Sequence, residues 1–149
     1  MTSRRVVTGL DGQGRSCVIV DGPPHSFGAG DGGFVWRTDA VPADNSPAAD
    51  FARVDFSYDL FHDGGTNFFY VTMEPGTQSS VHTTDTIDYI TMIRGEVVLV
   101  LDTGEVTLRA GDVLVDRGVS HQWRNDSAEP CAYTVVTVPA HPIGKGRTV

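Results

Sequence analysis

Hydrophobic and polar residues alternate along most of the chain with a period of two. No long segment shows the 3.6-residue period of an amphipathic helix, so the pattern predicts strands and few helices. Residues 50–56 fit either a strand or one short helical turn. The segments in which we expect strands are residues 5–10, 16–20, 34–38, 68–73, 80–84, 88–93, 96–101, 105–108, 113–116, 121–124 and 132–138.

Short turns separate these strands. They are rich in the residue types that tight turns favour, and they fall at residues 11–14, 75–76, 94–95, 102–104, 110–112 and 125–130. Many short strands with such regular turns predict an all-β fold. We expect an antiparallel jelly-roll β-barrel, because closure of this kind leaves few exposed sheet edges.

The length of 149 residues predicts one domain with a single core. Within it we expect N-terminal strands and a loop over residues 1–50, the barrel core over residues 68–138, and a tail over residues 139–149. The segments at residues 21–33 and 41–49 are predicted loops, because glycine, proline and small polar residues dominate them.

The charge balance narrows the range of partners. The chain has 11 lysines and arginines against 19 aspartates and glutamates, a net charge of −8, which argues against nucleic acid and anionic membranes. No apolar run is long enough to span a bilayer, and the first residues lack the apolar segment of a signal peptide. We therefore expect a cytoplasmic protein, in which Cys17 and Cys131 are reduced thiols.

Three chemically active side chains fall on strand positions that could share the barrel interior: His82, Asp88 and His121. Two imidazoles and one carboxylate are the set that holds Fe(II) with open coordination positions, and they also suit zinc. These three residues are therefore the predicted metal ligands and also the predicted catalytic residues.

Further residues are candidates for substrate binding. Neighbouring inward positions and nearby aromatic residues supply them, although the aromatic ones are expected more often in a core than in a binding site. Arg37 and Arg124 are the two arginines considered as anchors for a substrate carboxylate or phenolate. The predicted substrate-binding residues are Trp36, Arg37, Phe69, Thr84, Ile90, Met92 and Trp123.

Two segments resemble the motifs of the cupin family. The first family motif is a glycine, five residues, His-x-His, three residues, a glutamate, six residues and a glycine. This chain keeps every spacing, with Gly76, His82, Thr84, Asp88 and Gly95. The second motif is matched by Gly111, Gly118, His121 and Asn125, but the proline of its usual Pro-x-Gly is absent and the spacer is one residue short. The resemblance implies a small single-domain cupin, similar to polyketide cyclase and dehydratase-like cupins.

Two positions in the first motif depart from the family. Thr84 replaces the second histidine, and a neutral hydroxyl is a poor ligand for zinc or Fe(II). Asp88 replaces the glutamate and is one methylene shorter. The resemblance still implies one divalent metal, which could be zinc, iron, nickel or manganese, and His25 or His62 could supply a further ligand. It also implies a homodimer, because similar small cupins exchange N-terminal strands.

A metal-free site is the alternative. A carboxylate beside an imidazole fixes its tautomer and raises its basicity. His82 or His121, paired with Asp88, could then remove a proton next to a carbonyl and return it elsewhere, in a barrel that excludes water.

These patterns lead to three hypotheses about function. The first is a lyase or isomerase of secondary metabolism that dehydrates, decarboxylates, isomerises or cyclises an apolar carbonyl or phenolic molecule. The second is an Fe(II)-dependent dioxygenase, an oxidoreductase that uses His82, Asp88 and His121 as ligands. The third is a non-catalytic barrel that binds a small ligand.

Overall fold

The computed structural model describes residues 4–13, 15–28 and 32–149, and over these residues the fold is almost entirely β. The single helical element described is a short 3-10 helix, η1 (Tyr58–Phe61). Every paired strand is antiparallel to its neighbour. No helix among the described residues is long and apolar enough to cross a membrane.

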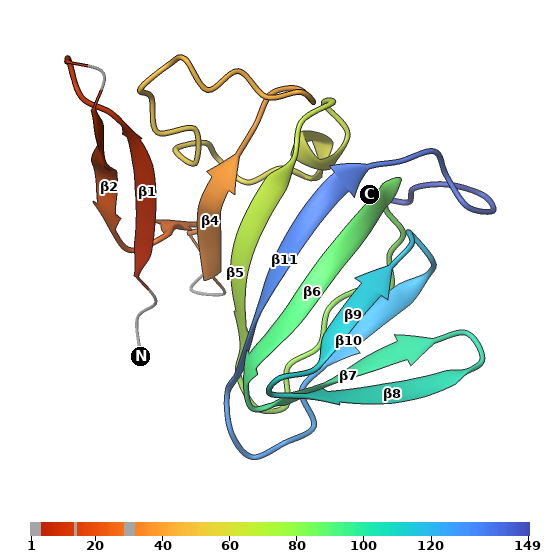
Figure 1. Cartoon of the computed structure of the whole chain (residues 1–149). Helices are drawn as coiled ribbons and strands as arrows, with labels where there is room; N and C mark the ends of the chain where they lie inside the picture. Colours follow the sequence, from red (N-terminus) through yellow and green to blue (C-terminus); the bar gives the residue numbers. More distant parts are fainter. Residues whose placement is uncertain (1–3, 14, 29–31) are drawn as a thin grey trace.

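Two sheets face each other and form the body of the molecule (Figure 1). The larger sheet has, in order, β3 (His25–Ser26), β4 (Gly32–Arg37), β5 (Asn67–Met73), β11 (Cys131–Pro139), β6 (Thr86–Arg94) and β9 (Val113–Asp116). The smaller sheet has, in order, β10 (His121–Arg124), β7 (Glu96–Leu101) and β8 (Gly104–Arg109). The all-β jelly-roll prediction is confirmed, although the two sheets keep separate hydrogen-bond ladders in the described part of the chain.

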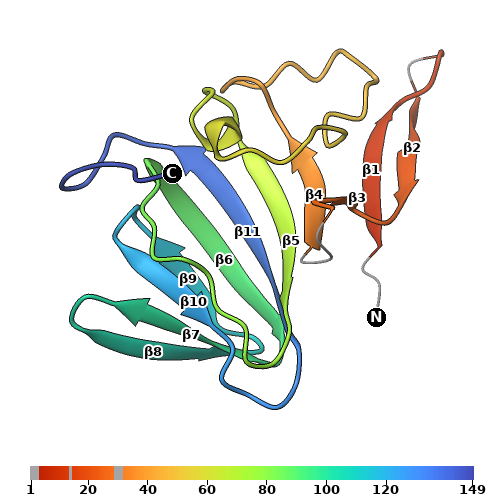
Figure 2. The same ribbon diagram turned by 180° about the vertical axis from the view of Figure 1, so that it is seen from behind.

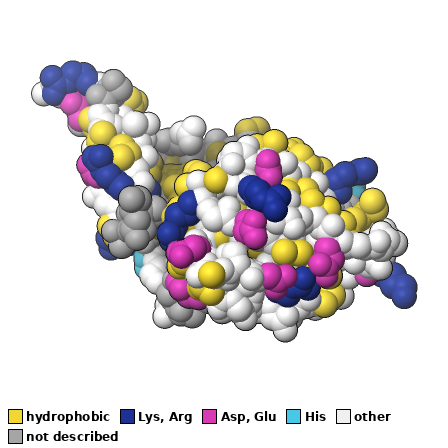
Figure 3. All heavy atoms as spheres, turned by 90° about the horizontal axis from the view of Figure 1, so that it is seen from below, with side chains coloured by type: hydrophobic (Ala, Val, Ile, Leu, Met, Phe, Trp, Pro, Cys, Tyr) yellow, Lys and Arg dark blue, Asp and Glu magenta, His cyan; other side chains and the backbone are white. Residues whose placement is uncertain are grey.

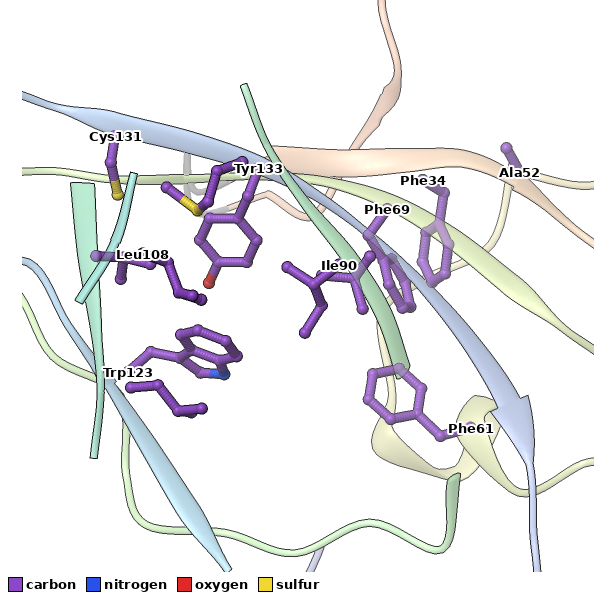
Figure 4. Close-up of a cluster of buried hydrophobic side chains, with 13 residues drawn as sticks. Phe34, Ala52, Phe61, Phe69, Ile90, Leu108, Trp123, Cys131 and Tyr133 are labelled. Carbon is purple, nitrogen blue, oxygen red and sulfur yellow. The ribbon is translucent and has the colours of Figure 1, made fainter. Parts of the chain in front are cut away.

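The hydrophobic core lies between the sheets (Figure 4). The larger sheet contributes Phe34, Phe69 and Ile90, all at most 3 % exposed, and the smaller sheet contributes Leu108 and Trp123. Buried and more exposed positions alternate along much of β6 and β11, which is the burial pattern expected from the period of two. This alternation fixes which side chains can reach the space between the sheets.

A third sheet stands apart from this body. It is the hairpin of β1 (Arg5–Leu10) and β2 (Ser16–Gly22), and it projects as an arm in Figures 1, 2 and 3. The buried guanidinium of Arg5 attaches the arm to the body, because it donates to the backbone oxygen of Val35 and to the carboxylate of Asp50 at 3.0 and 2.9 Å.

Most of the predicted strands are present, four of them with the predicted ends and the others with ends shifted by one or two residues. The hairpin of residues 5–10 and 16–20 is confirmed, and so is the dense series from residue 88 onward. In the loop predicted at 21–33, residues 25–26 form β3 and residues 32–33 begin β4, while residues 29–31 lie outside the described residues, as does Gly14 in the first turn.

Two strand predictions are wrong. Residues 80–84 form no strand, because only two isolated bridges, Gln78 with Arg124 and His82 with His121, join this segment to β10. Residues 50–56 form neither a strand nor a helix, and the helical turn begins later, after Ser57, whose hydroxyl accepts a hydrogen bond from the Asp59 amide. The helical turn therefore begins where the Ser57 side chain can cap it.

Candidate functional site

A cavity of about 620 Å³ lies between the two sheets. This volume is in the usual range for small-molecule sites. Its walls are mostly apolar and aromatic, and a few polar groups stand among them. Aromatic side chains from five segments form much of the wall, namely Phe27, Phe56, Tyr58, Phe61, Phe69, Trp123 and Tyr133. The polar groups that carry chemistry are His82, Thr84, Asp88 and His121.

The two histidines lie side by side in the wall. His82 and His121 form an isolated β-bridge, in which each backbone N–H donates to the other residue's carbonyl at 3.0 Å. Their ring centroids are 4.4 Å apart. The sequence prediction that these two residues converge is therefore confirmed, although a bridge between a loop and β10 brings them together instead of two regular strands.

Backbone carbonyls orient both imidazole rings. Nδ1 of His82 lies 2.9 Å from the Ser80 oxygen, and Nδ1 of His121 lies 2.9 Å from the Val119 oxygen. Because a carbonyl oxygen only accepts hydrogen bonds, each Nδ1 carries a hydrogen. In a neutral ring this leaves the Nε2 lone pair free to accept a proton or to bind a metal.

A second aspartate, Asp116, accompanies His121. Its Oδ2 lies 2.9 Å from Nδ1 of His121, and both side chains are almost completely buried. Oδ1 accepts hydrogen bonds from the backbone N–H groups of Gly118 and Val119. Nδ1–H is directed at the Val119 carbonyl, so the contact with Oδ2 is an ion-pair contact and not a second aligned hydrogen bond.

This pairing shifts the pKa values of the two groups in opposite directions. Burial acts to lower the pKa of His121, but the Asp116 carboxylate outweighs it and the pKa is raised from 6.5. Burial acts to raise the pKa of Asp116, but His121 and two backbone N–H groups outweigh it and the pKa is lowered from 3.8. The pair therefore favours an imidazolium beside a carboxylate. The pKa of His82 is lowered, chiefly by burial, which favours its neutral form.

Asp88 has a different environment. It lies on β6 directly across from Asp116 on β9, and it lines the cavity. Thr86 donates a 2.6 Å hydrogen bond to Oδ1 of Asp88, and the hydroxyls of Thr84 and Thr86 lie 2.8 Å apart. Burial is the main cause that raises the pKa of Asp88 to about 6, and the charge of Asp116 adds to it. Asp88 is therefore the carboxyl group of the site that can change protonation near neutral pH.

The predicted metal-ligand set is not assembled in this structure. Among the described residues, no three His, Cys, Asp or Glu side chains form a group that could hold a metal ion. The two free Nε2 atoms are suitable donors, but Thr84 is engaged by Thr86, and Asp88 accepts from Thr86. The residues present thus do not fit a facial set of three ligands, and metal binding stays a prediction.

The other predicted site residues fall into two groups. Phe69, Thr84, Ile90 and Trp123 line the cavity, whereas Met92 is 2 % exposed and lies in the core beside it. Trp36 and Arg37 lie elsewhere.

Trp36 packs against Phe51, and the buried guanidinium of Arg37 binds the carboxylates of Asp39 and Asp63. Arg124 is paired with Glu105 and Asp126 at the surface.

Neither of the two additional histidines joins this site. His25 lies in β3, and His62 lines a second cavity, where its Nε2 accepts a hydrogen bond from the backbone N–H of Asp85.

Sequence reasoning missed Asp116 and Tyr133. The signal for Asp116 was its position two residues before Gly118, where the second motif usually has its proline. A carboxylate at this turn position can accept hydrogen bonds from the backbone N–H groups that follow it. Tyr133 carried no signal, because an aromatic residue on a strand is usually part of the core.

Comparison with known proteins shows a family similarity over the part of the chain that carries most of the cavity wall. Residues 69–137 match the cupin domain family model (Cupin_2). "Phomopsin biosynthesis cluster protein D" of Diaporthe leptostromiformis is 44% identical over 86 residues, covering 56% of this chain and 46% of that protein. "Cupin-domain-containing oxidoreductase srdD" of Neurospora crassa is 31% identical over 128 residues, covering 81% of this chain and 65% of that protein. The chain thus spans about half to two thirds of the length of these relatives.

Among solved structures, a sugar phosphate isomerase from a cupin superfamily of Silicibacter pomeroyi aligns with a TM-score of 0.45 and 28% identity, over 50% of this chain and 51% of that chain. A Cupin 2 conserved barrel domain protein of Salinispora arenicola aligns with a TM-score of 0.47 and 25% identity, over 50% of this chain and 64% of that chain. The family match covers the strands that carry Asp88, His121 and most of the cavity wall, from β5 into β11. These strands, over residues 69–137 of this chain, are thus similar to a cupin domain.

Proposed function

We propose that this chain is an enzyme of secondary metabolism that binds a small, largely apolar molecule between its sheets and moves a proton with Asp88. The observation that carries this proposal is the position of the Asp88 carboxyl, which lines a mostly apolar cavity together with His82 and His121. Relatives named as biosynthesis cluster proteins of Diaporthe leptostromiformis and Aspergillus oryzae support the metabolic setting.

The three groups have distinct roles in this proposal. Asp88, with a pKa raised to about 6, can both accept and release a proton near neutral pH. The His121 imidazolium, held by Asp116, supplies positive charge for an enolate or phenolate that develops on the substrate. Neutral His82 offers its Nε2 lone pair as an acceptor for a substrate hydroxyl. The apolar walls keep water away from the transferred proton.

Proton removal next to a carbonyl is the step shared by dehydration, isomerisation and aldol-type cyclisation. In each of these the C–H bond breaks, its electron pair enters the enolate, and Asp88 takes the proton. The net reaction is then decided by where the proton returns or which group leaves.

An oxidoreductase is the second candidate, and the relatives favour it over a lyase or isomerase. Four of them are named cupin-domain-containing oxidoreductases, from Neurospora crassa, Aspergillus ruber and Hypocrea virens. On the structural side, Nε2 of His82, and Nε2 of His121 when its ring is neutral, are the two donors that a metal would find, one fewer than a facial set requires. Asp88 would serve this reaction as well: when a substrate alcohol is oxidised to a carbonyl by dioxygen, Asp88 takes the O–H proton, and the hydrogen of the C–H bond passes with two electrons to dioxygen, which leaves as hydrogen peroxide.

The first experiment measures proton exchange directly. The purified protein is incubated in D₂O with a panel of neutral aryl ketones, and deuterium at the carbon next to the carbonyl is followed by mass spectrometry. We expect exchange that is lost in Asp88→Asn and retained in Asp102→Asn, a matched change at an exposed turn between β7 and β8. Exchange that persists in Asp88→Asn would contradict the proposed role.

Oxygen consumption and metal content separate the two candidates. The same panel is tested aerobically and anaerobically, with elemental analysis of the wild type and of a His82→Ala/His121→Ala double variant. Substrate-dependent oxygen uptake, with a stoichiometric metal that the double variant lacks, would establish the oxidoreductase. Binding of the panel without exchange or uptake in any arm would instead leave a non-catalytic barrel.

A further inference from the structure

We propose that Tyr133 forms a second polar end of the cavity, and that the substrate is an uncharged, flat molecule with one oxygen near Asp88 and another bound by the Tyr133 hydroxyl. The position of the reacting end rests on the proposed function. The second end rests on the following features of β11, of the facing sheet and of the cavity walls.

The Tyr133 hydroxyl has a weak partner. Tyr133 is 4 % exposed and lines the cavity, and its hydroxyl donates to the thioether sulfur of Met73 at 3.7 Å. A thioether is a weak acceptor, whereas buried tyrosine hydroxyls usually have a strong one. A ligand oxygen would therefore replace the sulfur with a net gain.

Trp123 fixes the position of this phenol. It reaches across from the smaller sheet and stacks on Tyr133, with ring centroids 5.4 Å apart and an angle of 30° between the planes. Figure 4 shows the Tyr133 hydroxyl pointing inward toward Trp123. Because both rings are buried and stacked, the hydroxyl is pre-oriented, and little side-chain entropy is lost when a ligand binds.

The register of β11 against β6 sets the distance between the two ends. Thr137 lies across from Asp88, Val135 across from Ile90, and Tyr133 four residues from Thr137 on the same face of β11. At about 3.4 Å per residue, the two ends are about 13 Å apart along the backbone. The apolar side chains of Val135 and Ile90 lie between them and line the cavity, so a flat apolar body fits the middle.

Charge decides against an anionic substrate. None of the described residues that line this cavity is a lysine or an arginine. His121 already has an acidic partner, because its Nδ1 lies 2.9 Å from Oδ2 of Asp116. A carboxylate or phosphate would enter without a free counter-ion and would meet the negative charge of Asp88 and Asp116, so binding of an uncharged molecule is favoured.

The test compares three naphthalene probes by isothermal titration calorimetry: 2-naphthol, naphthalene-2,6-diol and 6-hydroxy-2-naphthoate. We expect the diol to bind wild-type protein about fivefold more tightly than 2-naphthol, because it gains one hydrogen bond. Tyr133→Phe should remove that ratio while binding of 2-naphthol is unchanged. The matched control Tyr70→Phe, on the outer face of β5, should keep the ratio. The naphthoate should bind more weakly than either.

Several results would overturn the proposal. Equal affinities of the diol and 2-naphthol for the wild type, or a ratio that survives in Tyr133→Phe, would remove the second polar end. Tight binding of the naphthoate, or no binding of any probe, would refute the substrate class. These outcomes are independent of the exchange experiment with Asp88→Asn, so loss of the Tyr133 role would leave the proposed function standing.

Discussion

Oδ2 of Asp116 lies 2.9 Å from Nδ1 of His121, and this contact joins the two sheets. Asp116 ends β9 in the larger sheet, and His121 begins β10 in the smaller one. The side chains of Asp116 and His121 are 2 % and 3 % exposed, so the pair is shielded from bulk water. One interaction therefore supports both the closure of the sandwich and the charge state of the site.

Asp116→Asn should destabilise the protein by about 3 kcal/mol near pH 5.5, because an imidazolium would be left buried without its partner. The raised pKa of His121 contributes stability that is full below pH 6.5 and is lost as the pH rises through the folded value. The lowered pKa of Asp116 contributes stability above pH 3.8 that is lost on acidification. Urea unfolding should thus show the largest loss between these values and a smaller loss at pH 9. An equal loss at both pH values would show that only the backbone hydrogen bonds of Asp116 matter.

Asp88→Asn should stabilise the protein at neutral pH, whereas Asp116→Asn should destabilise it. The folded-state pKa of about 6 exceeds 3.8, so the Asp88 contribution is fully present below pH 3.8 and is lost as the pH rises through 6. The difference in free energy of unfolding between the variant and wild type should therefore shift by about 3 kcal/mol in favour of the variant as the pH rises from 3.5 to 7.5. Asp102→Asn, on the surface, serves as the control, and parallel stability curves for wild type and Asp88→Asn would show that Asp88 titrates normally.

Gly118→Ala should be far more damaging than Gly76→Ala. Both glycines have positive φ, 73° and 72°, so alanine costs about 1 kcal/mol at each from backbone conformation. A Cβ at Gly118 would in addition lie 2.5 Å from the Thr84 carbonyl oxygen, whereas nothing lies within 4 Å at Gly76. We expect a further loss of about 2 kcal/mol or more at Gly118, measured by thermal unfolding. Equal melting temperatures would contradict the close approach of this turn to Thr84.

Thr148→Val should loosen the segment that carries His82 and Thr84. The Thr148 amide donates to the Thr83 carbonyl, and the Thr148 hydroxyl accepts from the Thr83 amide, both at 2.9 Å. Valine keeps the shape but removes the acceptor, at a cost of about 1 kcal/mol. Amide hydrogen exchange at Thr83 should become faster, while Thr103→Val in the exposed β7–β8 turn should leave it unchanged. Unaltered exchange in Thr148→Val would mean that the C-terminal segment does not hold Thr83.

The sequence predicted the fold well where local signals were sufficient. Alternation and turn residues determined the strands from residue 88 onward, because turn residues separate these strands in sequence, although only β7 and β8 pair as a hairpin. It failed at residues 80–84, where the alternating residues pair only through isolated bridges. Alternation reports which side chains share a face, and it does not report whether a backbone partner is available.

The candidate site was predicted in part for a similar reason. Motif spacing located His82, Asp88 and His121, and all three residues line one cavity. The environment of each group depends on pairs that are distant in sequence, such as Asp88 across from Asp116 on β9. Strand register creates these pairs, and register is fixed by the packing of the whole sheet. Arg37 shows the converse, since neither it nor its acidic partners Asp39 and Asp63 are among the residues that line the cavity.

The position of β11 in the larger sheet has a consequence for how the protein is made. This strand lies between β5 and β6, although both are synthesised well before it, and Asn67 on β5 bonds Thr137 across 70 residues of sequence. During translation, β3, β4 and β5 can pair on one side, and β6 and β9 on the other, but the two halves stay separate. Such non-local pairing slows folding and leaves strand edges exposed. The binding cavity can therefore form only after residues 131–139 have left the ribosome, and until then the edges of β5 and β6 that later pair with β11 stay unpaired.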